Sequence, residues 1–186
     1  MTVRLIPKVP QEIEDAMTWA GFALRMVQHA EEGLSVALRI TFHSAPAITA
    51  ASLAAEEDTV RRKTLGQLLR ELRRRVTIAD DFDTFLSEFL AHRNDFVHGK
   101  HSVLLDSVEG AAEFTRIASK LSGEASHVAM VLASALLAFA DELEATQAPG
   151  TEPLFPGLDA VPGAATTYAE LRAMAPAVQA SLRRKP

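Results

Sequence analysis

Apolar residues recur along this chain at spacings of three and four, which is the repeat of one face of a helix. Two long stretches of this pattern predict long helices over about residues 11–44 and 107–145. Two shorter stretches predict a helix from Asp58 or Thr64 to Arg75, and another over about residues 82–98. The positions expected to face inward are Met17, Ala20, Leu24, Val27, Leu34, Ala37 and Leu38 in the first long helix, Leu65, Leu68, Leu69 and Leu72 in the first short helix, and Phe114, Ile117, Leu121, Ala125, Val128, Leu132, Ala135, Phe139 and Leu143 in the second long helix.

The helices and the breaks between them predict an all-α fold, an up-and-down helical bundle of four to five helices with two long helices, over residues 1–146. Pro46 ends the first long helix, and residues 47–58 predict a loop with one helical turn. Prolines and glycines then mark a linker that begins residues 147–186. The short helix that follows is interrupted at Pro176, and we expect it to pack on the bundle or on a partner.

One charged residue breaks the apolar face of the helix over 82–98. On a helical wheel Arg93 lies about 40° from Phe89, inside the apolar arc. An arginine is rarely buried unless it is paired, so its position needs a reason. His98 lies about 140° further round, so the two side chains meet only if the last turn opens or if the motif faces a second copy of itself. Gly99 is suited to opening that turn, because glycine commonly follows a helix C-terminus.

The helix closes with Arg93-Asn94-Asp95-Phe96-Val97-His98. An Arg-Asn-x-x-x-His sequence at the end of an apolar helix resembles the HEPN superfamily, small all-helical domains marked by an arginine followed a few residues later by a histidine. The upstream segment 63–68, followed by a leucine-rich helix, is similar to members of that group as well. The resemblance covers roughly residues 60–101.

The resemblance implies that Arg93 and His98 are catalytic and that Asn94 supports them, with Asp95 as a weaker addition. These residue types suit metal-free cleavage of RNA. A neutral imidazole can take the proton from a ribose 2′-hydroxyl because its pKa lies near working pH. A guanidinium matches the phosphate oxygens with two parallel donors and stabilises the charge that develops on them.

HEPN proteins that keep the motif are commonly metal-independent endoribonucleases that act as toxins in toxin–antitoxin or phage-defence systems. They work as homodimers whose two motifs line one cleft. The expected partners are therefore RNA, a second copy of the chain and a cognate antitoxin such as a minimal nucleotidyltransferase, and no cofactor is expected. Many members are non-catalytic, so the alternative is a helical binding or regulatory module for a protein or a nucleotide.

A purely structural role for the motif is the other alternative. In that interpretation Arg93 pairs with a buried acid, either Asp95 or Glu88, and His98 only caps the end of its helix.

The positive charge of this acidic chain is concentrated in one helix. The net charge is −5, yet seven of the 19 Lys and Arg residues fall between residues 61 and 75. This cluster predicts contact with a phosphate backbone, and a solvated helix face beside Glu71 is an equally strong interpretation. The residues predicted to bind RNA are Arg70, Arg73, Arg74 and Arg75, together with Lys100 and His101 in the loop after the motif.

The chain has no cysteine and no basic region followed by an apolar run at its N-terminus, which predicts a cytoplasmic protein. The most apolar run, 128–140, is too short to cross a bilayer, so no membrane partner is expected. Asp95 is the only carboxylate near His92, His98 and His101, and no two histidines are four residues apart. We therefore predict no metal site.

Overall fold

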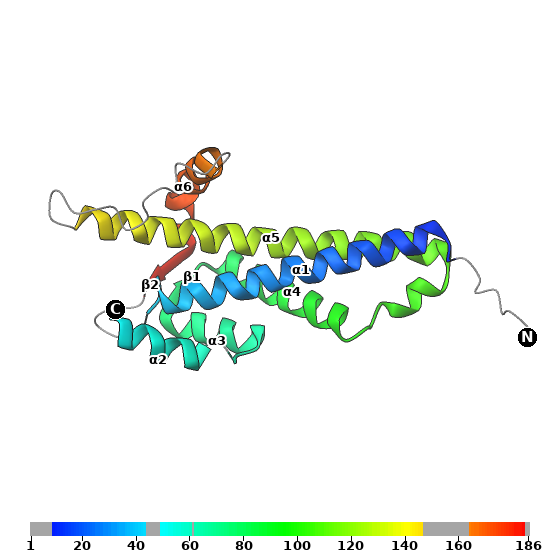
Figure 1. Ribbon diagram of the computed structural model, residues 1–186, viewed down its shortest axis with the longest axis horizontal. Coiled ribbons are helices and arrows are strands. Elements are labelled where there is room, and N and C mark those ends of the chain that lie inside the picture. The colour runs from blue at the N-terminus through cyan, green and yellow to red at the C-terminus, as the bar shows by residue number, and fades with distance from the viewer. Residues whose placement is uncertain (1–8, 44–48, 61, 147–163, 185–186) are drawn as a thin grey trace, which may run out of the picture.

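The computed structural model of the protein describes residues 9–43, 49–60, 62–146 and 164–184. Within these residues the all-α class and the two long helices are confirmed (Figure 1). The elements in chain order are α1 (Gln11–Arg39), α2 (Ala50–Val60), α3 (Leu65–Arg75), β1 (Val76–Ile78), α4 (Asp80–Val97), the short 3-10 helix η1 (Ser102–Asp106), α5 (Val108–Ala145), α6 (Ala164–Ser181) and β2 (Leu182–Arg184).

The two long helices meet along a column of alanines spaced seven residues apart. α1 and α5 lie side by side and run in the same direction, because α4 returns the chain between them (Figure 1). A repeat of seven keeps one side of a helix facing its neighbour, and alanine lets the two backbones approach closely. We call this column the alanine seam; its fully buried members are Ala16, Ala23, Ala30 and Ala37 of α1 and Ala111, Ala118 and Ala125 of α5.

The seam corrects the buried face predicted for the first half of α1. Met17 and Leu24, expected to face inward, are 59% and 38% exposed, whereas Ala16 and Ala23 beside them are completely buried. The helical spacing is as predicted, but in this half of the helix the buried face is one residue away from Met17 and Leu24. Close packing against α5 leaves room only for small side chains, so the larger ones lie on the flanks. All four leucines predicted to face inward in α3 are buried, as expected.

The region between the first long helix and α3 differs from the prediction. α1 ends at Arg39, because the chain turns there and brings Phe42 into the core at 5% exposure. Residues expected to form a loop instead form α2, which is rich in alanine, the best helix former. Its start is stabilised by reciprocal hydrogen bonds: the backbone N–H of each of Thr49 and Ser52 donates to the hydroxyl of the other, at 2.9 and 3.1 Å.

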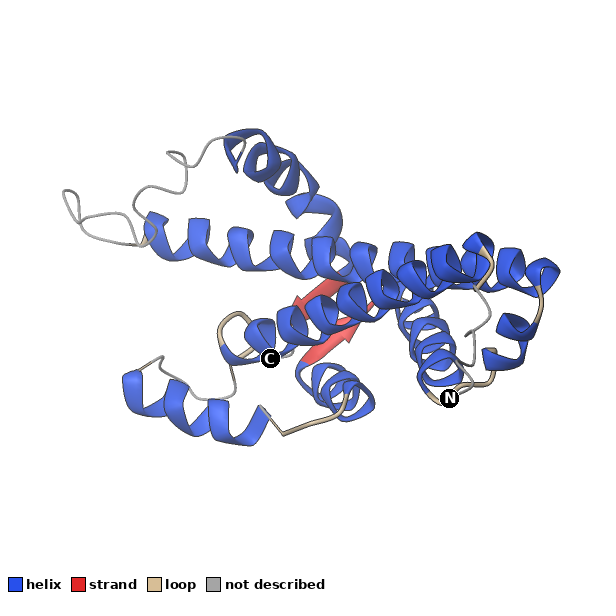
Figure 2. Ribbon diagram, turned by 45° about the vertical axis from the view of Figure 1, so that its right-hand side comes forward, coloured by secondary structure: helices blue, strands red, loops and turns tan. Residues whose placement is uncertain are grey.

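A pair of short strands, which the apolar pattern did not predict, ties the end of the chain to the bundle. β1 and β2 pair antiparallel, with Val76 opposite Arg184 and Ile78 opposite Leu182 (Figure 2). α6 continues through Pro176 and packs on α5, where Arg172 bonds Asp141 at 3.1 Å. The final helix therefore packs on the bundle. The predicted linker over 147–163 lies outside the described residues.

α4 packs against α5, is linked to α1 through the Arg93–Glu31 ion pair, and carries the motif at its end. The Phe96 ring packs on Phe114 of α5 at a centroid distance of 5.4 Å, and Phe85 packs edge-on against His127 at 5.0 Å. The helix ends at Val97, and Gly99 follows with a φ of 71°, a left-handed conformation that glycine adopts without strain. The chain can therefore reverse directly behind the motif.

Two glycines of α5 provide a matched test of this packing. A Cβ at Gly110 would overlap the carbonyl oxygen of Leu104, whereas a Cβ at Gly123 would meet nothing within 4 Å. We expect Gly123→Ala to stabilise the protein by about 0.5–1 kcal/mol, because alanine is the better helix former. Gly110→Ala is expected to destabilise it by about 2 kcal/mol, because backbone must move. Urea denaturation measures both changes, and equal effects would contradict the described contact between η1 and α5.

Candidate functional site at the end of α4

The last turns of α4 are attached to both long helices by adjacent residues. His92 Nδ1 lies 3.0 Å from both carboxylate oxygens of Glu124 on α5. Arg93 Nη2 donates to Glu31 Oε1 on α1 at 3.0 Å. Consecutive helical positions point about 100° apart, so one residue reaches each neighbour. The motif is therefore presented by a helix end that is fixed on two sides.

Arg93 is the more buried of the two predicted catalytic residues. Its side chain is 23% exposed; besides the pair with Glu31, Nη1 donates to Asn94 Oδ1 at 3.3 Å. Its Nε is buried and makes no hydrogen bond within the described part of the chain. The structural alternative expected Asp95 or Glu88 to pair with Arg93. In the structure the acid that pairs with it is Glu31. The sequence does not indicate Glu31, because the two residues are 62 positions apart and the periodic pattern reports only local faces.

His98 has a different environment. It is exposed and forms the C-cap of α4, with its backbone N–H donating to the Asn94 carbonyl at 3.0 Å. Among the described residues its ring takes part in no hydrogen bond or ion pair, and none links it to Arg93. The ring is therefore accessible to a bound molecule, but within one chain it makes no contact with Arg93.

Asp95 and Lys100 close the loop behind the motif. Lys100 Nζ lies 2.7 Å from Asp95 Oδ2, and the Lys100 N–H donates to the Asp95 carbonyl at 3.0 Å. The hydrogen bond from Lys100, with weaker help from the charges of His101 and His92, holds the pKa of Asp95 below its ordinary value. Asp95 is therefore ionised at neutral pH and faces α5, away from Glu31.

The predicted RNA-binding arginines of α3 fall into two groups. Arg70 and Arg74 are exposed, although Arg74 bonds Glu71 on the same helix. Arg73 is half-buried and connects α3 to α4, since Nε bonds Asp83 at 2.6 Å and Nη2 bonds Ser87 at 2.7 Å. Arg70 and Arg74 therefore remain on the surface, while Arg73 is largely occupied.

Arg75 is not part of the exposed basic face that the sequence suggested. Its side chain is 7% exposed and bonds Glu56 at 3.1 Å and Glu71 at 2.7 Å. It also donates to the carbonyl oxygens of Leu38, in the last turn of α1, and of Phe42, just after that helix. The surrounding Arg74, Arg75 and Lys63 lower the pKa of Glu71 to about 2 despite its partial burial. Arg75 thus joins α1, α2 and α3 from the inside.

The described residues offer no alternative centre based on a metal. No three histidine, aspartate or glutamate side chains in that part of the chain are grouped to hold an ion. No helix in the described ranges is long and apolar enough to cross a bilayer.

The comparisons with known proteins add no further constraint. The chain matches no known family model, no curated protein and no solved structure. The geometry at the end of α4 is therefore the basis for a functional proposal.

Proposed function

We propose that the protein is a metal-independent endoribonuclease of the HEPN type, with Arg93 and His98 as its catalytic residues. The observation that carries this proposal is the contrast between the two side chains at the end of α4. His98 is exposed and makes no hydrogen bond within the described residues, so its ring nitrogens are accessible to a substrate hydroxyl. Arg93 is anchored by Glu31 and Asn94, so its donors are positioned before a phosphate arrives.

The proposed reaction needs only these groups and the RNA. The His98 imidazole takes the proton of a ribose 2′-hydroxyl, and the 2′-oxygen attacks the adjacent phosphorus. The bond from phosphorus to the 5′-oxygen breaks, and the imidazolium returns its proton to that oxygen. Arg93 stabilises the added negative charge on the phosphate. The products are a 2′,3′-cyclic phosphate and a 5′-hydroxyl, and single-stranded or loop RNA is the substrate because its backbone bends freely for in-line attack.

A second copy of the chain completes the proposed site. Arg93 points towards α1 and His98 lies at the helix end, so Arg93 of one chain and His98 of the other would meet across a two-fold axis. Exposed valines within the motif and in the η1 and α5 segments that follow it offer an apolar surface for this contact. They are Val97, Val103 and Val108, which are 43%, 67% and 40% exposed.

We place the RNA strand along the exposed side chains of Arg70, Arg74 and Lys100 and the half-buried His101, with Arg73 contributing only its exposed third. In the cell we propose a cytoplasmic toxin of a toxin–antitoxin or phage-defence system. Its activity would be controlled by a cognate antitoxin such as a minimal nucleotidyltransferase.

The direct test is cleavage of a single-stranded RNA by the purified protein in EDTA. We expect fragments that end in a 2′,3′-cyclic phosphate, identified by mass spectrometry, at the same rate as without EDTA. A preparation that cuts no RNA, or that stops cutting when EDTA is added, would refute the proposal.

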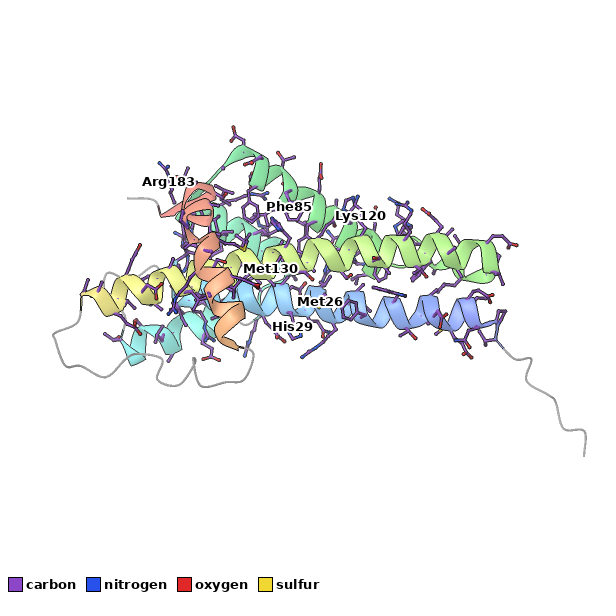
Figure 3. All side chains as sticks on the ribbon, turned by 90° about the horizontal axis from the view of Figure 1, so that it is seen from above. Met26, His29, Phe85, Lys120, Met130 and Arg183 are labelled. Carbon is purple, nitrogen blue, oxygen red and sulfur yellow. The ribbon has the colours of Figure 1, made fainter. Side chains whose placement is uncertain are left out.

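The proposed dimer has its own measurement. Light scattering at micromolar concentration is expected to give twice the mass of one chain. Val103→Glu should shift it towards the monomer, because a charge would be buried at the contact. Met130→Glu on α5 is the matched control, since Met130 is also exposed but lies far along α5 from the motif (Figure 3). A wild-type monomer would argue against the two-copy site.

One observation favours the binding-module alternative. The Glu31 carboxylate already neutralises Arg93, as expected for a structural ion pair. In that case the end of α4 would bind a protein or a nucleotide without cutting RNA, and the cleavage test above separates the two functions.

A further inference from the structure

A cavity of about 290 Å³ lies beside the motif, between the end of α4, the loop after Gly99 and α5. Its floor is apolar and is formed by Ile117 and Leu121 of α5. Lys120, which lines the cavity too, lies where α5 runs beside α4 (Figure 3). The volume is at the lower end of the range of roughly 300–1,000 Å³ for small-molecule sites, so it suits a single ring system.

Two carboxylates supply hydrogen-bond acceptors at the rim. Asp95 Oδ2 receives Lys100, while Oδ1 has no hydrogen bond within the described residues. Glu113 receives both Nε and Nη2 of Arg116, at 2.8 and 2.6 Å, and each oxygen keeps a further lone pair. The hydrogen bonds from Lys100 and Arg116 lower the pKa values of Asp95 and Glu113, so both remain acceptors at neutral pH.

Cationic donors and two rings complete the lining. Arg116 and Lys120 are 68% and 57% exposed, so their side chains can turn towards a ligand. His92 and His101 line the same cavity, and His92 is oriented by Glu124. The cavity thus offers paired acceptors, adjacent donors and flat apolar or aromatic surfaces.

We propose that this cavity binds a guanine base. The Watson–Crick edge of guanine carries two neighbouring N–H groups, which a carboxylate such as Asp95 accepts together, beside a carbonyl oxygen that Lys120 or Arg116 can bond. Adenine and cytosine place a ring acceptor next to their amino group, and uracil places carbonyls on both sides of its N–H. Each of these bases would turn an acceptor towards the carboxylate. The inference rests on the proposed function: the guanine would belong to a guanosine of the RNA, next to the phosphodiester bond that is cleaved.

The test compares the four nucleoside 5′-monophosphates by calorimetry and by amide NMR shifts. The guanosine nucleotide is expected to bind about tenfold or more tightly than the others, with shifts at Asp95 and Ile117. Inosine monophosphate, which lacks the 2-amino group, should bind more weakly than the guanosine nucleotide. Asp95→Asn is expected to remove the preference.

Asp141→Asn is the matched control, because Asp141 is also a half-exposed carboxylate paired with a cation, Arg172 at 3.1 Å, but does not line the cavity. It should keep the preference for guanine. Equal affinities for the four nucleotides, or an Asp141→Asn variant that loses the preference as Asp95→Asn does, would overturn the proposal.

The outcomes also show whether the bound guanine belongs to a free nucleotide or to RNA. They further distinguish failure of this inference from failure of the proposed function. Preferential binding of short RNAs with one guanosine over RNAs with inosine supports a base of the substrate. Binding of the mononucleotide without those RNAs supports a guanine site for a free nucleotide. Guanine-selective binding without any RNA cleavage keeps the site and refutes the ribonuclease. Cleavage that depends on His98 but shows no base preference keeps the ribonuclease and refutes the site.

Discussion

Replacing His98 with alanine is expected to slow RNA cleavage by about 100- to 10,000-fold, the usual effect of removing a general base. The stability of the protein should change little, because the ring is exposed and forms no hydrogen bond within the described residues. His29→Ala is the control: His29 is also an exposed histidine, 45% by its side chain, but it lies on α1 and outside the motif (Figure 3). It should cleave as the wild type does.

The measurement is the initial rate of cleavage of a labelled RNA, with unfolding followed in parallel. A His98→Ala protein that cuts at the wild-type rate would rule out His98 as the base. Arg93→Ala is a less clean probe, because it leaves Glu31 without its partner and so alters the packing of α4 on α1 as well as the chemistry.

Arg75→Ala is expected to destabilise the protein by about 3 kcal/mol, because it removes the cation that Glu56 and Glu71 share, where their side chains are only 9% and 15% exposed. Arg74→Ala is the matched control. Arg74 bonds the same Glu71, but its side chain is 66% exposed, so a loss of under about 1 kcal/mol is expected.

Urea denaturation followed by circular dichroism measures both losses. Similar values for the two variants would contradict a structural role for Arg75. The two variants should also differ in RNA binding, because of the two arginines only Arg74 is exposed enough to contact a strand. Removing Arg74 should therefore weaken RNA binding at low salt.

The local parts of the fold could be predicted because they depend on neighbouring residues. Leu65, Leu68, Leu69 and Leu72 are buried as their spacing requires, and α5 begins and ends within a residue of the expected bounds. α2 was missed because small residues give little periodic signal. The pairing of β1 with β2 was missed because three-residue strands depend on a partner that lies far along the chain.

The candidate site shows the same division. The sequence indicated that Arg93 needed a partner, since an arginine within an apolar arc is costly to bury. It gave no means of choosing Glu31, because that choice depends on how α4 lies across α1. Arg75 was assigned to the surface with its neighbours, because a run of basic residues does not reveal which one turns inward. The cavity beside Asp95 arises only when α4 and α5 are brought together.

The alanine seam sets the distance between α1 and α5, the two helices to which α4 is bonded. Ala30 is one residue before Glu31, and Ala125 is one residue after Glu124, so each anchor of α4 is adjacent to a contact between the long helices. A larger side chain at either alanine would push α1 and α5 apart and pull Glu31 and Glu124 in opposite directions. His92 and Arg93 are neighbours on α4, so they could not both keep their bonds to the two separated carboxylates. The alanine side chains thus set the distance between Glu31 and Glu124, the two carboxylates that hold α4 through Arg93 and His92.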